Sequence, residues 1–210
     1  LAATSSWRIP ILLTSAYCLF VLILFYYKYP SLPKHEEQKE QRKQEMKKSI
    51  YAIGKTGWPV WLLAIIWMMY NASAISFLTF GGDYYKSVGY DAGYAGFLTS
   101  LLMIGALLLS SLVGYLVDKA KHVEYFIIGG SVVLAISLFL VPRTETNPLL
   151  LGILIGIAAP FVPAPVFSMV PRFLPPEQLG LGYGILSTCL NIGVLIGPFL
   201  IGLSYDLTHN

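Results

Sequence analysis

Residues 92–117 read AGYAGFLTSLLMIGALLLSSLVGYLV and contain no charged side chain. A helix needs about 20 apolar residues to cross a hydrocarbon core of roughly 30 Å. A charge at its centre would cost about 2.5–3.5 kcal/mol. Within this stretch Leu98–Leu109 is continuously apolar or small, without the alternation that barrel strands show. The stretch therefore predicts a transmembrane helix.

Charge-free runs of this kind recur along the chain. One such run could be a buried helix of a soluble protein, but six in succession could not. We therefore predict an all-α, polytopic transmembrane bundle with six spans. The runs cover 144 of the 210 residues and are 9–27, 56–82, 92–117, 125–142, 146–171 and 178–205.

The composition agrees with a membrane protein. Hydrophobic residues make up 56% of the chain and charged residues 12%, whereas a globular protein has about 25% charged residues. Twelve of the 25 charged residues lie between Lys28 and Lys55, so too few remain to cover a soluble surface. The composition also excludes a disordered chain, a nucleic-acid-binding module and a disulfide-stapled secreted domain.

The basic residues predict the orientation. The connections after the first, third and fifth runs hold eleven Lys and Arg residues, and the opposite side holds only Arg8, Lys86 and Arg143. By the positive-inside rule the 28–57 loop is cytoplasmic and both termini are external. Within this loop Lys34–Lys48 permits either a helix or a solvated linker.

The start of the chain predicts a fragment. No Met, basic region or cleavage site precedes the first run. We expect an odd number of spans ahead of Trp7, in a longer membrane protein. A half-length protein that dimerises is the alternative.

Small residues and prolines mark two features inside the runs. Gly152-x-x-x-Gly156 and Gly193-x-x-x-Gly197 have the spacing that lets helices approach closely in lipid, for fixed packing or for a moving contact. The fifth run contains three prolines in six residues, Pro160 to Pro165, which should kink or unwind it. Such a break indicates either a packing kink or a transporter binding site.

Neutral polar residues lie at mid-membrane depth. Tyr70 and Asn71 are central in the second run, Asn191 is central in the sixth, and Pro160 is central in the fifth. An Asn in hydrocarbon needs hydrogen-bond partners, so both Asn side chains should face the bundle interior. There they would bind helix to helix or contact a polar solute.

Residues for catalysis or metal binding are missing from the runs. No ionisable Asp, Glu, Lys, Arg or His lies inside any run, and no hydrolase, phosphate-binding or metal-binding motif occurs. Cys18 and Cys189 sit singly in mid-run, and the three His residues are dispersed. We expect no enzyme, no metal and no cofactor.

A family resemblance begins at Gly114-Tyr-Leu116-Val-Asp118-Lys119. This segment resembles the cytoplasmic signature of the major facilitator superfamily, although Lys121 replaces its usual Gly. The resemblance implies that Gly114, Asp118 and Lys119 form a conformational motif. It also implies that Asp118 engages the cytoplasmic start of the sixth span, where a helix N-terminus favours an anion.

The order of segments is similar to helices six to eleven of that family. The expected domains are a first span over 1–27, a basic central loop over 28–57 and a helical bundle over 58–206. Helix twelve and an N-terminal half of the same protein would lie outside the chain. The resemblance implies that Tyr70, Asn71 and Pro160 line the solute path, with Asn191 at its flank.

The expected function is secondary active transport of a small polar solute by rocking of two halves around a midplane site. Among branches, anion permeases of the cyanate or nitrate type and lysosomal dipeptide-carrier-like members are the most similar. We expect an organic or inorganic anion as solute and the plasma membrane as location. A non-transporting receptor, scaffold or accessory subunit on the same fold is the alternative, and a membrane-integral enzyme is a more distant one.

Overall fold

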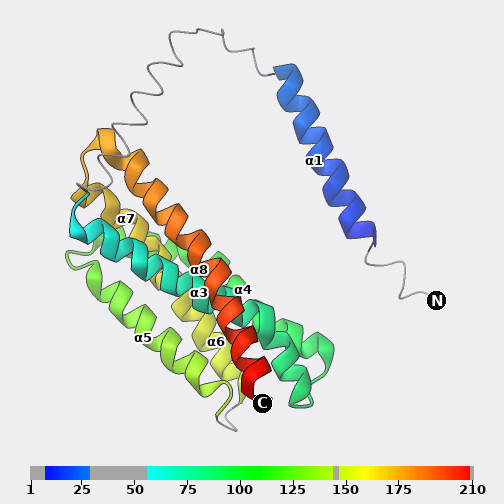
Figure 1. Ribbon diagram of the computed structural model, residues 1–210. Helices are drawn as coiled ribbons and strands as arrows, with labels where there is room; N and C mark the ends of the chain where they lie inside the picture. The colour runs from blue at the N-terminus through cyan, green and yellow to red at the C-terminus, as the bar shows by residue number, and fades with distance from the viewer. Residues whose placement is uncertain (1–7, 29–55, 144–146, 209–210) are drawn as a thin grey trace. The chain divides into compact units, whose positions relative to one another are not determined.

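A computed structural model describes residues 8–28, 56–143 and 147–208, and within these ranges all regular structure is helical. The chain divides into two compact units, residues 1–48 and 49–210, which are considered separately. The first contains α1 (Arg8–Lys28). The second, here called the bundle, contains α3 (Trp58–Ser87), α4 (Ala92–Lys119), α5 (Glu124–Leu140), α6 (Pro148–Ala158), η1 (Ala159–Phe161), α7 (Pro163–Phe173), η2 (Pro176–Gln178) and α8 (Leu179–Thr208) (Figure 1).

Four helical stretches in the described residues are long and apolar enough to cross a membrane: Trp58–Ser87, Ala92–Lys119, Pro148–Phe173 and Pro176–Leu207. Two shorter apolar helices cover Leu12–Lys28 and Glu124–Leu140. The predicted all-α, multi-pass membrane bundle is thereby confirmed, while two of the six predicted spans stay predictions. Most of the predicted 28–57 loop lies outside the described residues.

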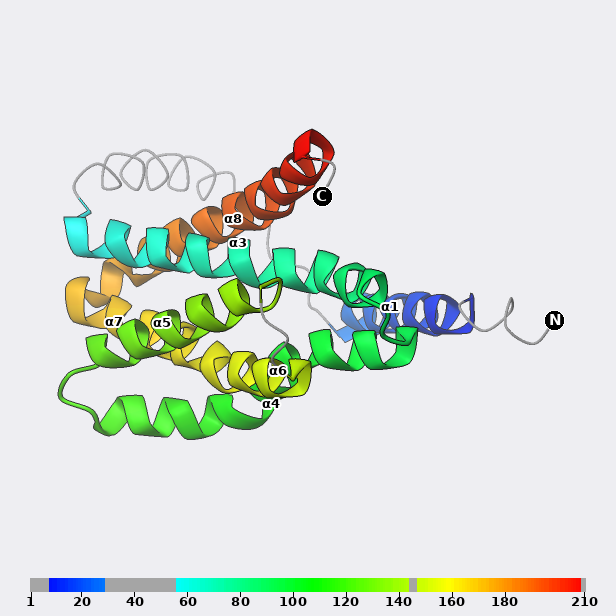
Figure 2. The same cartoon turned by 90° about the horizontal axis from the view of Figure 1, so that it is seen from below.

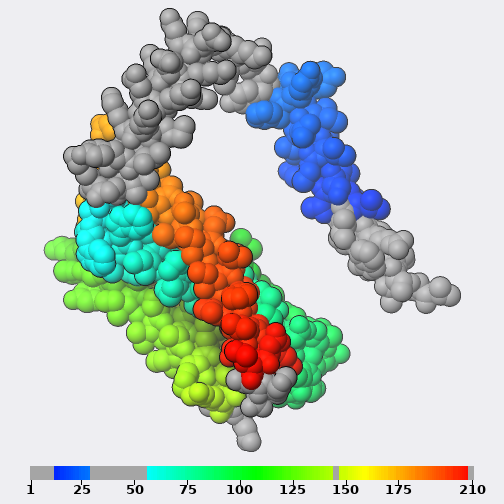
Figure 3. All heavy atoms as spheres, viewed as in Figure 1, coloured from blue at the N-terminus to red at the C-terminus, as the bar shows by residue number. Residues whose placement is uncertain are grey.

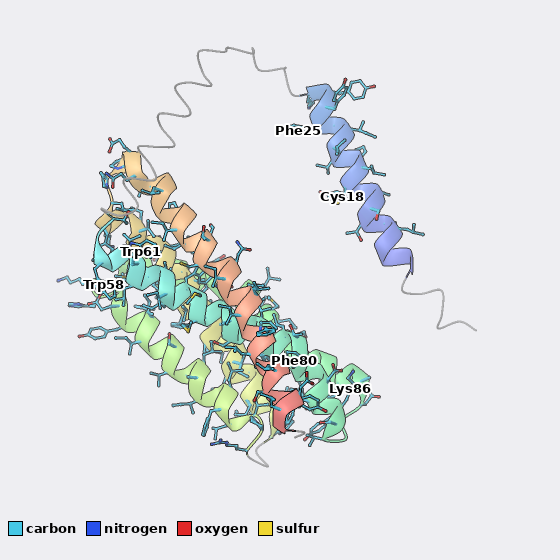
Figure 4. All side chains as sticks on the ribbon, in the orientation of Figure 1. Cys18, Phe25, Trp58, Trp61, Phe80 and Lys86 are labelled. Carbon is cyan, nitrogen blue, oxygen red and sulfur yellow. The ribbon has the colours of Figure 1, made fainter. Side chains whose placement is uncertain are left out.

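Local signals in the sequence set the helix starts. The carboxylate of Asp91 accepts a hydrogen bond from Gly93 N at 2.8 Å before α4, and Asn147 Oδ1 accepts one from Leu149 N at 3.0 Å before α6. The chain reverses between α3 and α4 at Gly89, whose φ of 99° suits glycine. Trp58 and Trp61 lie at one end of α3 and Lys86 near the other (Figure 4).

The predicted Gly193-x-x-x-Gly197 pair lies where α8 crosses α3, two helices that pack side by side (Figures 1 and 2). A methyl group on Gly193 would stand 2.2 Å from the Met68 carbonyl oxygen, and one on Gly197 would stand 2.4 Å from that of Ala72. These distances show that the two backbones are in direct contact. Any side chain at either glycine would push the helices apart.

The second predicted pair lies where α6 crosses α4. A methyl group on Gly156 would stand 2.5 Å from the Leu101 carbonyl oxygen, and one on Gly105 would stand 2.2 Å from the Gly156 carbonyl oxygen. Gly152 meets the Leu101 side chain one turn away. Both glycine pairs are therefore sites of close helix packing.

The predicted break in the fifth run is also confirmed. The α6 helix ends at Ala158, a single 3-10 turn follows over Ala159–Phe161, and α7 restarts at Pro163. Around it, one buried cluster joins the first half of α3 to α7 and the start of α8, and a second joins the rest of α3 to α4 and α6. The break thus lies where the two clusters meet.

The α3–α8 crossing provides a stability test. Gly193→Ala should lower the free energy of unfolding by about 1–3 kcal/mol, because the added methyl group overlaps the Met68 carbonyl and forces α8 away from α3. Gly184→Ala is the matched control on the same helix, since a methyl group there meets no atom within 4 Å. Unfolding in detergent measures both variants, and equal losses would contradict the close crossing.

Candidate functional site

Tyr70 and Pro160, two of the predicted solute-path residues, lie close together. The Tyr70 hydroxyl in the middle of α3 donates a hydrogen bond to the Ala159 carbonyl oxygen in η1 at 2.9 Å. Pro160 follows directly and is buried. The structure therefore places Tyr70 against the helix break, with its hydroxyl bonded to the backbone.

Three neighbouring helices pack against the break. Tyr70 of α3 is the first of these contacts. Gly105 of α4 lies against the Gly156 carbonyl. In a regular helix this carbonyl would accept a hydrogen bond from the N–H of residue 160, which is a proline and has none. Gly130 of α5 packs on Phe161, because a methyl group added to Gly130 would stand only 2.4 Å from Phe161 Cβ. Packing thus accounts for the break within the bundle, and a solute contact of Pro160 stays a prediction.

Four aromatic side chains connect α3, α7 and α8. Trp67 stacks on Tyr70 with ring centroids 5.4 Å apart and planes 8° apart. The Phe167 ring meets Trp67 edge-on at 5.3 Å, and Tyr183 stacks on Phe167 at 5.9 Å. The sequence reasoning named only Tyr70 of these. No signal in the sequence singles out the other three, because aromatic residues recur throughout the apolar runs.

Asn71 is half-buried on α3. Its Nδ2 donates to the Trp67 carbonyl oxygen one turn earlier at 2.8 Å. An amide side chain has two N–H donors and a carbonyl acceptor, so this bond leaves one donor and the acceptor for a further partner. Asn71 could therefore recognise a solute that both donates and accepts hydrogen bonds.

Asn191 is exposed on the described bundle, and its orientation toward the interior of a complete transporter stays a prediction. Its Nδ2 donates to the Ser187 carbonyl oxygen at 2.7 Å, so its own helix satisfies one donor and no partner helix is required for that bond. By helical periodicity Asn191 lies opposite Gly193, the residue that contacts α3. The structure does not bring Asn191 and Asn71 together on one face.

Asn191 belongs to a run of small and polar residues along the outer side of α8. This α8 polar face consists of exposed residues at helical spacing: Gly180, Gly184, Ser187, Thr188 and Asn191. Thr188 Oγ1 donates to the Gly184 carbonyl oxygen at 2.9 Å. Polar side chains at membrane depth usually face protein or a watery cavity, so we expect this face to be covered by one of them.

A groove of about 600 Å³ runs beside the α8 polar face, between the start of α8 and Trp61 of α3. Figure 3 shows α8 on the surface of the molecule, and Figure 4 labels Trp61. Most of the side chains that line the groove are apolar, and Thr188 contributes a hydroxyl group. Its lining residues are Trp61, Gly180, Leu181, Gly184, Ile185, Thr188, Cys189 and Ile192.

The signature segment lies at the end of α4. Lys119 Nζ contacts the Tyr115 hydroxyl and lies 4.2 Å from the centroid of the Tyr115 ring. Asp118 is exposed and forms no ion pair with any other residue that the structure describes. The predicted contact of Asp118 with the start of α8, and the motif role of Gly114, stay predictions.

Comparison with known proteins adds two findings. The family model of the Major Facilitator Superfamily matches residues 1–198. The lysosomal dipeptide transporter MFSD1 of Homo sapiens is 24% identical over 149 residues, which are 70% of this chain and 32% of that protein. The proteins of the same name from Danio rerio and Gallus gallus are also 24% identical, over 70% of this chain. The match thus spans about a third of the length of these relatives.

Proposed function

Because the chain belongs to the major facilitator superfamily, we propose that it forms part of a secondary active transporter for a small polar solute. The solute would cross by alternating access, as two sets of helices rock around a site near the midplane. Family membership points to a transporter rather than an enzyme. The N-terminal half expected from the sequence, which would supply the second set of helices, stays a prediction.

One observation supports the transport proposal most strongly. The bundle consists of apolar helices, yet Asn71 has a further donor and an acceptor at mid-depth, one residue after Tyr70, whose hydroxyl bonds to the Ala159 carbonyl at the helix break. An amide at this depth is costly unless it has a polar partner. The Trp67 carbonyl satisfies one N–H of the Asn71 amide, and a passing solute would pair with the remaining donor and acceptor.

A dipeptide is the first solute to test, because the relatives named above carry that activity in their name. A dipeptide has amide, ammonium and carboxylate groups, so it can donate to and accept from Asn71. The organic or inorganic anion expected from the sequence is the second solute to test. The described spans supply neutral polar groups for either solute.

The location in the cell has two candidates. The chain is an integral, multi-pass membrane protein. The sequence led us to expect the plasma membrane, whereas the relatives are named as lysosomal. Fluorescence microscopy of the tagged protein with markers for both membranes distinguishes the two.

Flux in proteoliposomes tests transport directly. The full-length protein from the reading frame that contains this chain should take up radiolabelled dipeptides or small anions faster than empty vesicles. Saturable uptake that an excess of unlabelled solute inhibits is the expected result. Absence of flux for every solute tested, with binding retained, would instead favour the receptor or scaffold alternative.

Asn71→Ala tests the proposed solute contact. Loss of one hydrogen bond should reduce the uptake rate at low solute concentration roughly three- to tenfold, with normal expression in the membrane. Thr79→Ala is the matched control, because Thr79 is exposed on the same helix and its hydroxyl donates to the Ile75 carbonyl of that helix. Unchanged uptake kinetics of Asn71→Ala would exclude Asn71 as a contact.

A further inference from the structure

The break between α6 and α7 removes a specific backbone bond. In a continuous helix the Ala159 carbonyl would accept a hydrogen bond from the N–H of residue 163. That residue is Pro163, which has no N–H. The 3-10 turn over Ala159–Phe161 replaces the regular helix at this position. Its i→i+3 pattern pairs the Ala159 carbonyl with the Val162 N–H, and the second lone pair of the carbonyl oxygen can accept from another donor.

Tyr70 supplies such a donor. Its hydroxyl reaches the Ala159 carbonyl oxygen at 2.9 Å from a residue 89 positions earlier in the chain. The geometry is well supported, because the Tyr70 ring stacks flat against the buried Trp67 ring. A hydroxyl held in this way adds a bond from α3 to this carbonyl at a fixed point in space.

The same turn of α3 also contacts the other side of the break. The Trp67 ring meets the Phe167 ring of α7 edge-on, with centroids 5.3 Å apart. Tyr70 thus contacts the segment before Pro163 and Trp67 the segment after it. Together the two side chains connect α3 to both sides of the break.

We propose that Tyr70 is a positioning residue: its hydroxyl ties α3 to the Ala159 carbonyl, whose α-helical partner Pro163 lacks an N–H, and so sets the angle of the α6–α7 break. This proposal rests on the proposed transport function, since the angle matters for the movement of the solute path. It assigns Tyr70 a role other than the solute contact predicted from the sequence. Loss of the hydroxyl should slow the conformational step and leave solute affinity unchanged.

A double-mutant cycle in the full-length protein tests whether the Tyr70 hydroxyl and the proline at position 163 act on the same carbonyl. Tyr70→Phe keeps the ring and its stacking but removes the donor, and Pro163→Ala restores a backbone N–H for Ala159. Tyr70→Phe alone should lower the unfolding midpoint by about 2–4 °C, and its effect in the Pro163→Ala background should be less than half as large. Equal effects in both backgrounds would overturn the proposal.

The matched control is Tyr84→Phe. The Tyr84 hydroxyl also donates to a carbonyl of another segment, that of Val141 at 3.1 Å, but far from the break. Its effect should be the same with and without Pro163→Ala. If Pro163→Ala changed the effect of Tyr84→Phe on the unfolding midpoint as much as that of Tyr70→Phe, Pro163→Ala would alter the whole bundle. That result would count against the proposal.

A distance measurement covers the case in which Pro163→Ala fails to fold. Spin labels at Leu150 of α6 and Phe173 of α7, both exposed, report the angle across the break. Tyr70→Phe should broaden or shift their distance distribution, and an unchanged distribution would overturn the proposal. Neither the distance measurement nor the double-mutant cycle requires transport activity. The positioning role can therefore be contradicted or supported independently of the proposed transport function.

Uptake kinetics separate positioning from solute contact. We expect Tyr70→Phe to lower the maximal uptake rate at least threefold with KM unchanged. A raised KM with an unchanged maximal rate would show that Tyr70 contacts the solute, and would overturn the positioning role. If the wild-type protein shows no flux, only the transport proposal fails.

Discussion

Backbone groups inside a membrane have no water to bond to, so each N–H and C=O must find a partner within the protein. This constraint is most severe where Pro160 and Pro163 interrupt the fifth run. Three helices meet there, with Gly105 at the Gly156 carbonyl, Tyr70 at the Ala159 carbonyl and Gly130 against Phe161. α3, α4 and α5 thus all contact this segment between α6 and α7.

Close helix contacts make this packing possible. In lipid the helices gain little from hydrophobic burial against each other, so packing depends on small residues that bring backbones together. The α6–α4 crossing at Gly156 brings Gly105 to the carbonyl that Pro160 leaves without its usual partner. The α8–α3 crossing at Gly193 fixes the helix that carries Tyr70. The two glycine pairs and the proline run therefore act as one structural unit.

Much of this fold could be predicted from the sequence, because its causes are local. A charge inside a span is costly, so the uncharged runs matched helices such as α4. Glycine spacing indicated the close crossings, and Pro160 indicated the break. The donor for the Ala159 carbonyl could not be predicted in this way. Tyr70 is 89 residues away, and only the folded structure shows that it reaches this carbonyl.

The side-chain partners of the polar and aromatic residues were harder to predict, for a similar reason. Asn191 was expected inside because a lone amide in hydrocarbon needs a partner, but the Ser187 carbonyl of its own helix provides one. Trp67, Phe167 and Tyr183 were not singled out, because aromatic residues are common in apolar runs and only their contacts distinguish them. Side-chain partners across helices therefore had to come from the structure.

Hydrogen–deuterium exchange at the break tests the central claim, that the interrupted backbone is sealed by neighbouring helices. The informative amides are those of Phe161, Val162 and Ala164, measured in the full-length protein in lipid nanodiscs. If the break is enclosed, these amides exchange as slowly as those of the buried α4 residues Leu98 and Leu102. Exchange within seconds would contradict the claim, because it would place the broken backbone against water.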